Sequence, residues 1–199
     1  MLIDFTPVEQ KTIKLGEFAQ QFSVEDLRRA TNASLDLLRS IIDQTDDRHI
    51  AFDPLDPKAD DPHAIEGEEK IGWSLGHLVA HVTATSEESA AVASVLARGI
   101  AYPREPRLRY ETPWRDISTK SHAVQRLEES RRIRLGYLAA FPDHPFFDLK
   151  QDISERALEM WGDINARTRF LLGLYHEWQH YDQFRDVLGQ ALAAHPVTA

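Results

Sequence analysis

DINARTRFLLGLYHEWQHYDQFRDVL, at residues 163–188, decides the fold of this chain. Its apolar side chains surround a helix axis, with Leu171 and Trp178 on one side and Val187 on the other. A helix that is apolar on nearly all sides is expected at the centre of a helical domain. The stretch therefore predicts a long helix, and we expect it to be the most buried helix of an all-α fold.

Three more helices are predicted ahead of this one. The first begins at Ser23, where Ser-Val-Glu-Asp resembles a capping box, the second spans about 71–97 and the third about 118–140. Each has an apolar stripe at helical spacing, which is typical of a helix that packs on one face. The inward positions are Leu27, Thr31, Ser34, Leu38 and Ile41, then Leu75, Leu78, Val82, Ser89 and Leu96, then Val124, Leu127, Leu135 and Leu138.

The rest of the chain is predicted to connect these helices within one domain. Three stretches rich in proline and acidic residues are predicted loops: 46–70, 101–117 and 141–152. Thr6 and Pro7, followed by Glu9, predict a short additional helix near the start, because proline suits the first helical position. A chain of 199 residues with 42% hydrophobic composition is long enough for one core and short for two, so residues 1–199 are predicted to form a single domain.

The composition excludes several classes of protein. The chain has no cysteine, so a metal site must use nitrogen and oxygen ligands. A net charge of -9 without a basic run argues against nucleic-acid binding. No apolar run approaches the roughly 18 residues of a membrane span, and MLIDFTPVEQ lacks the features of a secretory signal. We therefore expect a cytoplasmic protein that acts on a small molecule.

Histidines form the clearest chemical pattern in the sequence. In HEWQHYDQ, His176 and His180 stand four apart on the predicted last helix, so both imidazoles project from one face and can share a metal ion. Gly173, one turn earlier, removes a side chain beside the pair, and Gln183, one turn later, could orient a ligand or a bound water.

A third ligand is predicted from WSLGHLVAH in the second helix, which offers His77 and His81. His81 lies roughly 60° from the centre of the apolar stripe and His77 roughly 100° away, so His81 is the predicted ligand and His77 is expected beside the ligands. Any one of these histidines could instead be an ordinary polar residue on a partly buried face. Two pairs spaced four apart on separate helices favour a metal site.

HEWQH also fits the zinc-protease pattern, in which the glutamate between two histidines is a general base. Glu177 would then activate water. However, no glutamate follows Glu177, and the longer protease pattern needs a glycine where this chain has Gln183. Glu177 projects roughly 80° from the midpoint of the histidine pair, so it is alternatively a salt-bridge partner within the helical domain.

Other residues are candidates for binding the substrate. Arg131 falls in the apolar stripe of the third helix, where it could grip a substrate carboxylate, pair with a glutamate of the domain or extend to solvent. Arg169 is a second candidate for the same role. Trp73 and Trp114 could line the mouth of a pocket or simply pack, and the acidic stretch 46–70 could be a lid or a solvated linker.

These motifs resemble the DinB-like superfamily. Its pattern has Trp-Ser or Trp-Thr opening the second helix, a histidine eight residues after the tryptophan, and His-x3-His-x2-Gln in the fourth helix. The matching residues here are Trp73, Ser74, His81, His176, His180 and Gln183. The chain departs from the family pattern in the long acidic loop, the additional His77 and the extended start before Ser23.

The resemblance implies a fold and an activity. The fold is a four-helix bundle of up-down-down-up type, here with a short N-terminal helical extension, and dimers are frequent, which implies a homodimer. Three histidines would hold one divalent ion, zinc or nickel, with water completing the ligand shell. Characterised members resemble thiol transferases or isomerases that use a low-molecular-weight thiol such as bacillithiol or mycothiol.

Three neutral imidazoles leave a metal ion its full +2 charge and an open position, which is typical of a Lewis acid. Such an ion can activate a thiol for transfer, with Arg131, Glu177 and Gln183 as the candidate catalytic residues, or activate water for hydrolysis with Glu177 or a loop carboxylate as base. A metal-binding module without catalytic activity, retained for stress response or sensing, is the third alternative.

Overall fold

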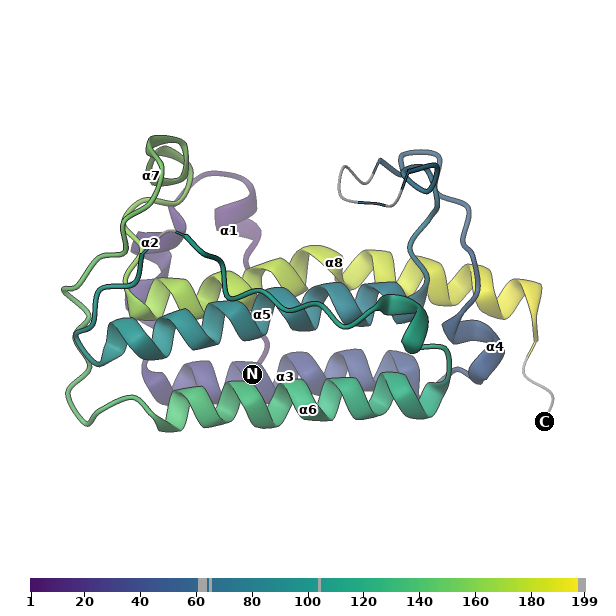
Figure 1. The fold of residues 1–199 in the computed structure, drawn as a ribbon, viewed down its shortest axis with the longest axis horizontal. Helices are drawn as coiled ribbons and strands as arrows, with labels where there is room; N and C mark the ends of the chain where they lie inside the picture. The colour runs from purple at the N-terminus through teal and green to yellow at the C-terminus, as the bar shows by residue number, and fades with distance from the viewer. Residues whose placement is uncertain (61–63, 65, 104, 197–199) are drawn as a thin grey trace.

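The computed structural model describes residues 1–60, 64, 66–103 and 105–196, and every regular element in these ranges is helical. The prediction of an all-α fold is confirmed. Four long helices run along the longest dimension of the molecule (Figure 1). They are α3 (Val24–Ile42), α5 (Leu75–Ala97), α6 (Lys120–Ala139) and α8 (Ala166–Ala194). α5 packs mainly against α6 and α8, and α3 packs against the same two helices.

Shorter elements lie before and between the long helices: α1 (Thr6–Glu9), α2 (Leu15–Phe18), η1 (Ala19–Gln21), α4 (Asp47–Ile50), η2 (Trp114–Asp116) and α7 (Glu155–Trp161). α1 lies where the sequence predicts a short helix, although Asp4 rather than a threonine accepts the first free N–H, that of Thr6. α2, η1 and α7 were not predicted. α4 and η2 interrupt two stretches that were predicted to be loops throughout.

Polar side chains set the first residue of each long helix. Ser23 and Asp26 form the predicted capping box at the start of α3. Ser74, Thr119 and Asn165 cap α5, α6 and α8, each accepting a hydrogen bond from the backbone N–H three residues later. The predicted starts of these three helices are therefore a few residues too early, because the cap marks the boundary and apolar periodicity does not.

The most buried helix is α5, so the prediction that the last helix holds this position is wrong. In α5, 18 of the 23 residues are buried, against 13 of 29 in α8. Alanine and serine make up much of α5, which lets α8, α6 and the segment before η2 approach it on several sides. α8 exposes Asp182, Arg185 and Asp186. Neither α5 nor any other helix in the described ranges is long and apolar enough to cross a membrane.

The inward face of α6 is rotated relative to the predicted stripe. Its buried residues are Ala123, Leu127, Ser130, Arg134 and Leu138. Val124 and Leu135, which were predicted to point inward, are only half-buried. As a result Arg134, with 1% of its surface exposed, is the arginine in the interior, and Arg131 is not.

Candidate metal centre

Three histidines from two helices meet beside the packed face of α5 and α8. His81 comes from α5, and His176 and His180 come from consecutive turns of α8. Their ring centroids are 4.8–5.2 Å apart, and one ring nitrogen from each lies within 4.8 Å of the other two. The structure therefore places these three side chains close enough to bind a metal ion.

Gly173 allows this meeting of the two helices. It lies one turn before His176, and a Cβ at this position would be 2.9 Å from Ser86 Cα on α5, closer than carbon atoms approach in proteins. Ser86 donates a hydrogen bond to the Gly173 carbonyl at 3.1 Å. The glycine thus serves the contact between α5 and α8, and through it the spacing of His81 and His176.

The separation of the ring nitrogens suits coordination of one ion. His81 Nε2 and His176 Nε2 are 3.1 Å apart. Two nitrogens on one zinc ion, each at about 2.0–2.1 Å and separated by an angle of about 90–110°, are about 2.8–3.4 Å apart. The observed pair lies within this range, so the spacing of these two nitrogens is compatible with two ligands of one ion.

Burial keeps the three imidazoles neutral, which is the form that binds metal. Desolvation, followed by the neighbouring histidines and Arg109, lowers the pKa of His81 to about 2. The pKa of His176 is lowered to about 3, again mainly by burial and then by His180 and Arg109. Burial also lowers the pKa of His180, against the opposing effect of a hydrogen bond with Gln183. A second proton therefore does not occupy any of the three rings near neutral pH.

Gln183 fixes the orientation of His180. The Nδ1–H of His180 donates to Gln183 Oε1 at 2.8 Å, which leaves Nε2 without a proton and available to a metal ion. The sequence predicted that Gln183 would orient a ligand or a bound water, and the structure places it against a predicted ligand.

Replacing Gln183 with alanine should lower the affinity for a divalent ion by about 10–100-fold, the usual cost of removing the hydrogen-bond partner of a metal-binding histidine. Gln190→Ala is the matched control, because Gln190 lies about two turns further along α8 and bonds to Leu55 and Asp186 instead of a histidine. Calorimetric titration of the metal-free proteins with zinc measures both. An unchanged affinity in Gln183→Ala would show that Gln183 does not support the site.

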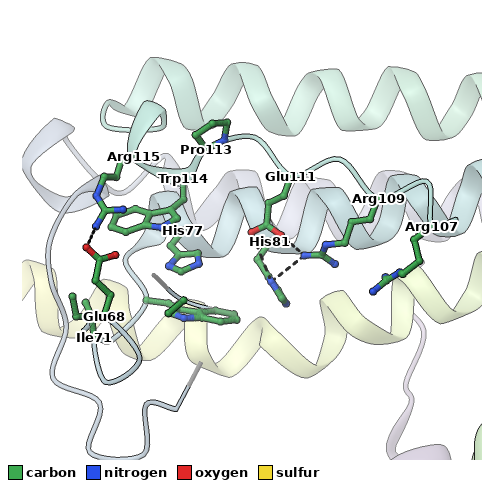
Figure 2. A pocket seen from close by; sticks show the side chains of 12 residues that line it. Glu68, Ile71, His77, His81, Arg107, Arg109, Glu111, Pro113, Trp114 and Arg115 are labelled. Carbon is green, nitrogen blue, oxygen red and sulfur yellow. Dashed lines mark hydrogen bonds and ion pairs between the residues drawn. The ribbon is translucent and has the colours of Figure 1, made fainter. Parts of the chain in front are cut away.

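A cavity of about 680 Å³ opens beside His81 (Figure 2). Its lining residues are Ala64, Glu68, Ile71, Trp73, His77, His81, Arg107, Arg109, Glu111, Pro113, Trp114 and Arg115. The side chain of His81 is 20% exposed, so a small molecule in the cavity can reach the face of the three-histidine group. Carboxylates and guanidinium groups line the same space as two indole rings, which suits a ligand with both polar and apolar parts.

Aromatic rings form one wall of the cavity. His77 is stacked between Trp73, at 4.5 Å between ring centroids, and Trp114, at 4.9 Å and an interplanar angle of 3°. His77 lies outside the three-histidine group, and its role beside the metal ligands stays a prediction. Trp73 also contacts His81 and His180, so the wall joins the cavity to the histidines.

Glu177 points away from the histidines into the interior between α3, α6 and α8. Its Oε1 lies 2.8 Å from Arg134 Nη1 in an ion pair that excludes solvent on both sides. Ser34 donates to Glu177 Oε2 at 2.6 Å, and Tyr181 donates to Ser34 at 2.7 Å. This is the salt-bridge role that the sequence left open for Glu177. Because both carboxylate oxygens have partners in the interior, Glu177 is not available as the general base of the zinc-protease interpretation.

The structure does not bring Arg131 to the histidines. Its guanidinium donates to Asn32 and Asp36 of α3 and to Glu128 on its own helix, so pairing within the domain is its observed role. Arg169 lies 3.9 Å from the buried Glu88. Neither arginine lines the cavity beside His81.

The arginines that do line the cavity were missed by the sequence reasoning. Arg107, Arg109 and Glu111 alternate in RLRYE and all face the cavity, as alternate residues of an extended segment do. Arg107 pairs with Glu88, and Arg109 pairs with Glu111. The charged residues at every second position were the signal in the sequence for this cavity wall. The pattern is short, however, and it lies in a proline-rich stretch that predicted only a loop.

Comparison of the chain with protein-family models, curated proteins and solved structures finds no match in any of the three. The proposed function therefore rests on the residues of the site and their geometry.

Proposed function

We propose that this protein is a metalloenzyme of the DinB-like type, a thiol-dependent transferase that holds one divalent ion, zinc or nickel, with His81, His176 and His180. The observation that carries the proposal is the convergence of three neutral imidazoles beside a cavity large enough for a small organic substrate. A closed structural site would have no need of such a cavity.

The path of the chain supports the family assignment. α3 and α8 run in one direction along the molecule and α5 and α6 in the other, and residues 105–117 run back along α5 toward the start of α6 (Figure 1). This course of the chain supports the up-down-down-up order that the resemblance implies. Trp73 and Ser74 stand at the start of α5, and Gln183 contacts a histidine. The resemblance also implies a homodimer, which is part of the same proposal.

The residues of the site have separate roles in this proposal. An ion held by three neutral imidazoles acts as a Lewis acid and lowers the pKa of a thiol, so that a thiolate nucleophile is available at neutral pH. Gln183 orients His180. Trp73 and Trp114 cover the apolar part of a substrate, while Arg107 and Arg109 offer guanidinium groups to an anionic part.

Hydrolysis is the second candidate, and one observation favours it. Glu111 lines the cavity with its Oε1 4.0 Å from His81 Nδ1, so a loop carboxylate stands where a base could act on water. Glu177 is not available for this role because it is paired with Arg134. The same protein would then cleave an ester or amide without any thiol.

A turnover assay separates the two reactions. Metal-loaded protein is mixed with bacillithiol, mycothiol or cysteine and an activated aryl halide, and separately with a nitrophenyl ester and no thiol. We expect loss of thiol with the aryl halide, abolished in His180→Ala and retained in His122→Ala, a histidine variant on exposed α6 surface. Ester cleavage without thiol would establish hydrolysis instead, and no turnover of either kind by protein with bound metal would leave a non-catalytic module.

A further inference from the structure

The hydrogen bonds around the histidines determine which ring nitrogen of each carries the proton. Gln183 Oε1 can only accept, so His180 carries its proton on Nδ1. Arg109 Nη2 lies 3.2 Å from His81 Nδ1, and a guanidinium can only donate. His81 Nδ1 must therefore accept this hydrogen bond, and the proton of neutral His81 is on Nε2.

This assignment gives His81 a different state from its two neighbours. The Nε2–H of His81 donates to His176 Nε2 at 3.1 Å, which places the proton of His176 on Nδ1. His176 and His180 thus both present a bare Nε2 to the site, whereas the Nε2 of His81 is blocked by a proton. A metal ion cannot bind that nitrogen until the proton has moved.

Glu111 lies where it can accept a hydrogen bond from His81 Nδ1–H when the proton is on that nitrogen. Binding of metal at Nε2 requires the tautomer with hydrogen on Nδ1, and this N–H would face a donor of Arg109. Glu111 can take the place of Arg109 as the hydrogen-bond partner of Nδ1. Its Oε1 is 4.0 Å from His81 Nδ1, and its Oε2 already accepts a hydrogen bond from Arg109 Nη2 (Figure 2). Arg109 also donates through Nη1 to the Thr85 hydroxyl on α5.

We propose that Arg109 and Glu111 are positioning residues that control metal binding through the tautomer of His81. In the metal-free protein Arg109 donates to Nδ1 and holds the proton on Nε2. In the metal-bound protein Glu111 accepts from Nδ1–H, and Arg109 moves off the ring. One proton leaves Nε2 and one arrives at Nδ1 through solvent, so the imidazole stays neutral. This inference rests on the proposed metal site and adds the residues that regulate it.

The two residues should have opposite effects on metal affinity. Glu111→Ala removes the acceptor that orients the ligating tautomer and should weaken zinc binding by about 10–100-fold. Arg109→Ala removes the donor that disfavours the ligating tautomer of His81, and it should tighten zinc binding. Glu68→Ala and Arg115→Ala are matched controls, because this ion pair lines the same cavity and has no contact with His81. If the Glu68→Ala and Arg115→Ala variants changed zinc affinity as much as the Glu111→Ala and Arg109→Ala variants, the charge of the cavity alone would explain the effects. That result would overturn the proposal.

Nitrogen-15 NMR of histidine-labelled, metal-free protein reads the tautomer directly. We expect His81 to carry its proton on Nε2 in the native protein and to shift toward Nδ1 in Arg109→Ala, while Arg115→Ala keeps the native state. Native protein with the proton on Nδ1, or an unchanged tautomer in folded Arg109→Ala that binds metal normally, overturns the role of Arg109. Failure of the native protein to bind any metal overturns the proposed function instead.

Discussion

His81→Ala should weaken metal binding far more than His77→Ala. Loss of His81 removes one of the three converging nitrogens, so the expected loss of affinity exceeds the roughly 10–100-fold that removal of an outer hydrogen-bond partner costs. His77 is stacked between Trp73 and Trp114 outside the group, so its replacement should mainly disturb the cavity wall. Titration of the metal-free variants with zinc, beside the native protein, measures the difference.

Comparable losses in the two variants would contradict this choice of ligand. Both proteins should first be shown to keep their helical content by circular dichroism, because His81 and His77 lie on the same helix. A larger loss in His77→Ala would mean that the stacked ring leaves its tryptophans to bind metal, and the ligand set would then have to be redrawn.

Glu177→Gln should destabilise the protein by about 3–5 kcal/mol, the usual cost of removing one partner from a buried ion pair. The substitution keeps the shape of the side chain but leaves the guanidinium of Arg134, with 1% of its side chain exposed, without a counter-charge. Urea unfolding of the metal-free protein measures the change. Arg131→Gln is the control, because the Asp36 partner of Arg131 is largely exposed and such pairs contribute about 1 kcal/mol or less.

A double variant distinguishes the pair from a local packing defect. Replacing Glu177 and Arg134 together by leucine and methionine removes both charges, and it should recover much of the stability lost in Glu177→Gln. Native stability with abolished turnover in Glu177→Gln would instead support a catalytic glutamate, as in the zinc-protease interpretation, and would contradict the structural role.

The helices and the spacing of the histidines within each helix could be predicted because local rules determine them, whereas the meeting of His81 with His176 depends on the packing of α5 against α8. The Ser23 capping box sets the start of α3 by bonds within one turn. The four-residue spacing of His176 and His180 is a property of any helix, and the apolar stripe of α5 separates His81 from His77. No contact with a distant part of the chain is needed for any of these conclusions.

The interior of α6 could not be predicted from its own stripe. Arg131 and Arg134 are one turn apart, and both interrupt apolar positions, so periodicity does not tell which one is buried. The distinction depends on Glu177 and Ser34, which come from α8 and α3 and meet Arg134 only after packing. The same reason explains why α5 is the most buried helix: its coverage depends on a segment further along the chain.

The segment from 105 to 117 carries much of the site and was the hardest part to predict. The part of this segment before η2 forms no regular element, and its role follows from contacts with α5. Arg109 reaches Thr85 and His81, and Arg107 reaches Glu88. Alternating charges near proline fit both an exposed loop and the wall of a cavity, and only the position of α5 decides between them.

The most direct test of the central claim is the metal content of the purified protein after reconstitution with zinc, nickel or manganese, compared with His176→Ala and His180→Ala. Elemental analysis should find about one equivalent per chain in the native protein and a loss of that metal in both variants. Native protein that retains no metal under any of these conditions would contradict the claim, and a metal content that persists in both variants would place the ion elsewhere in the molecule.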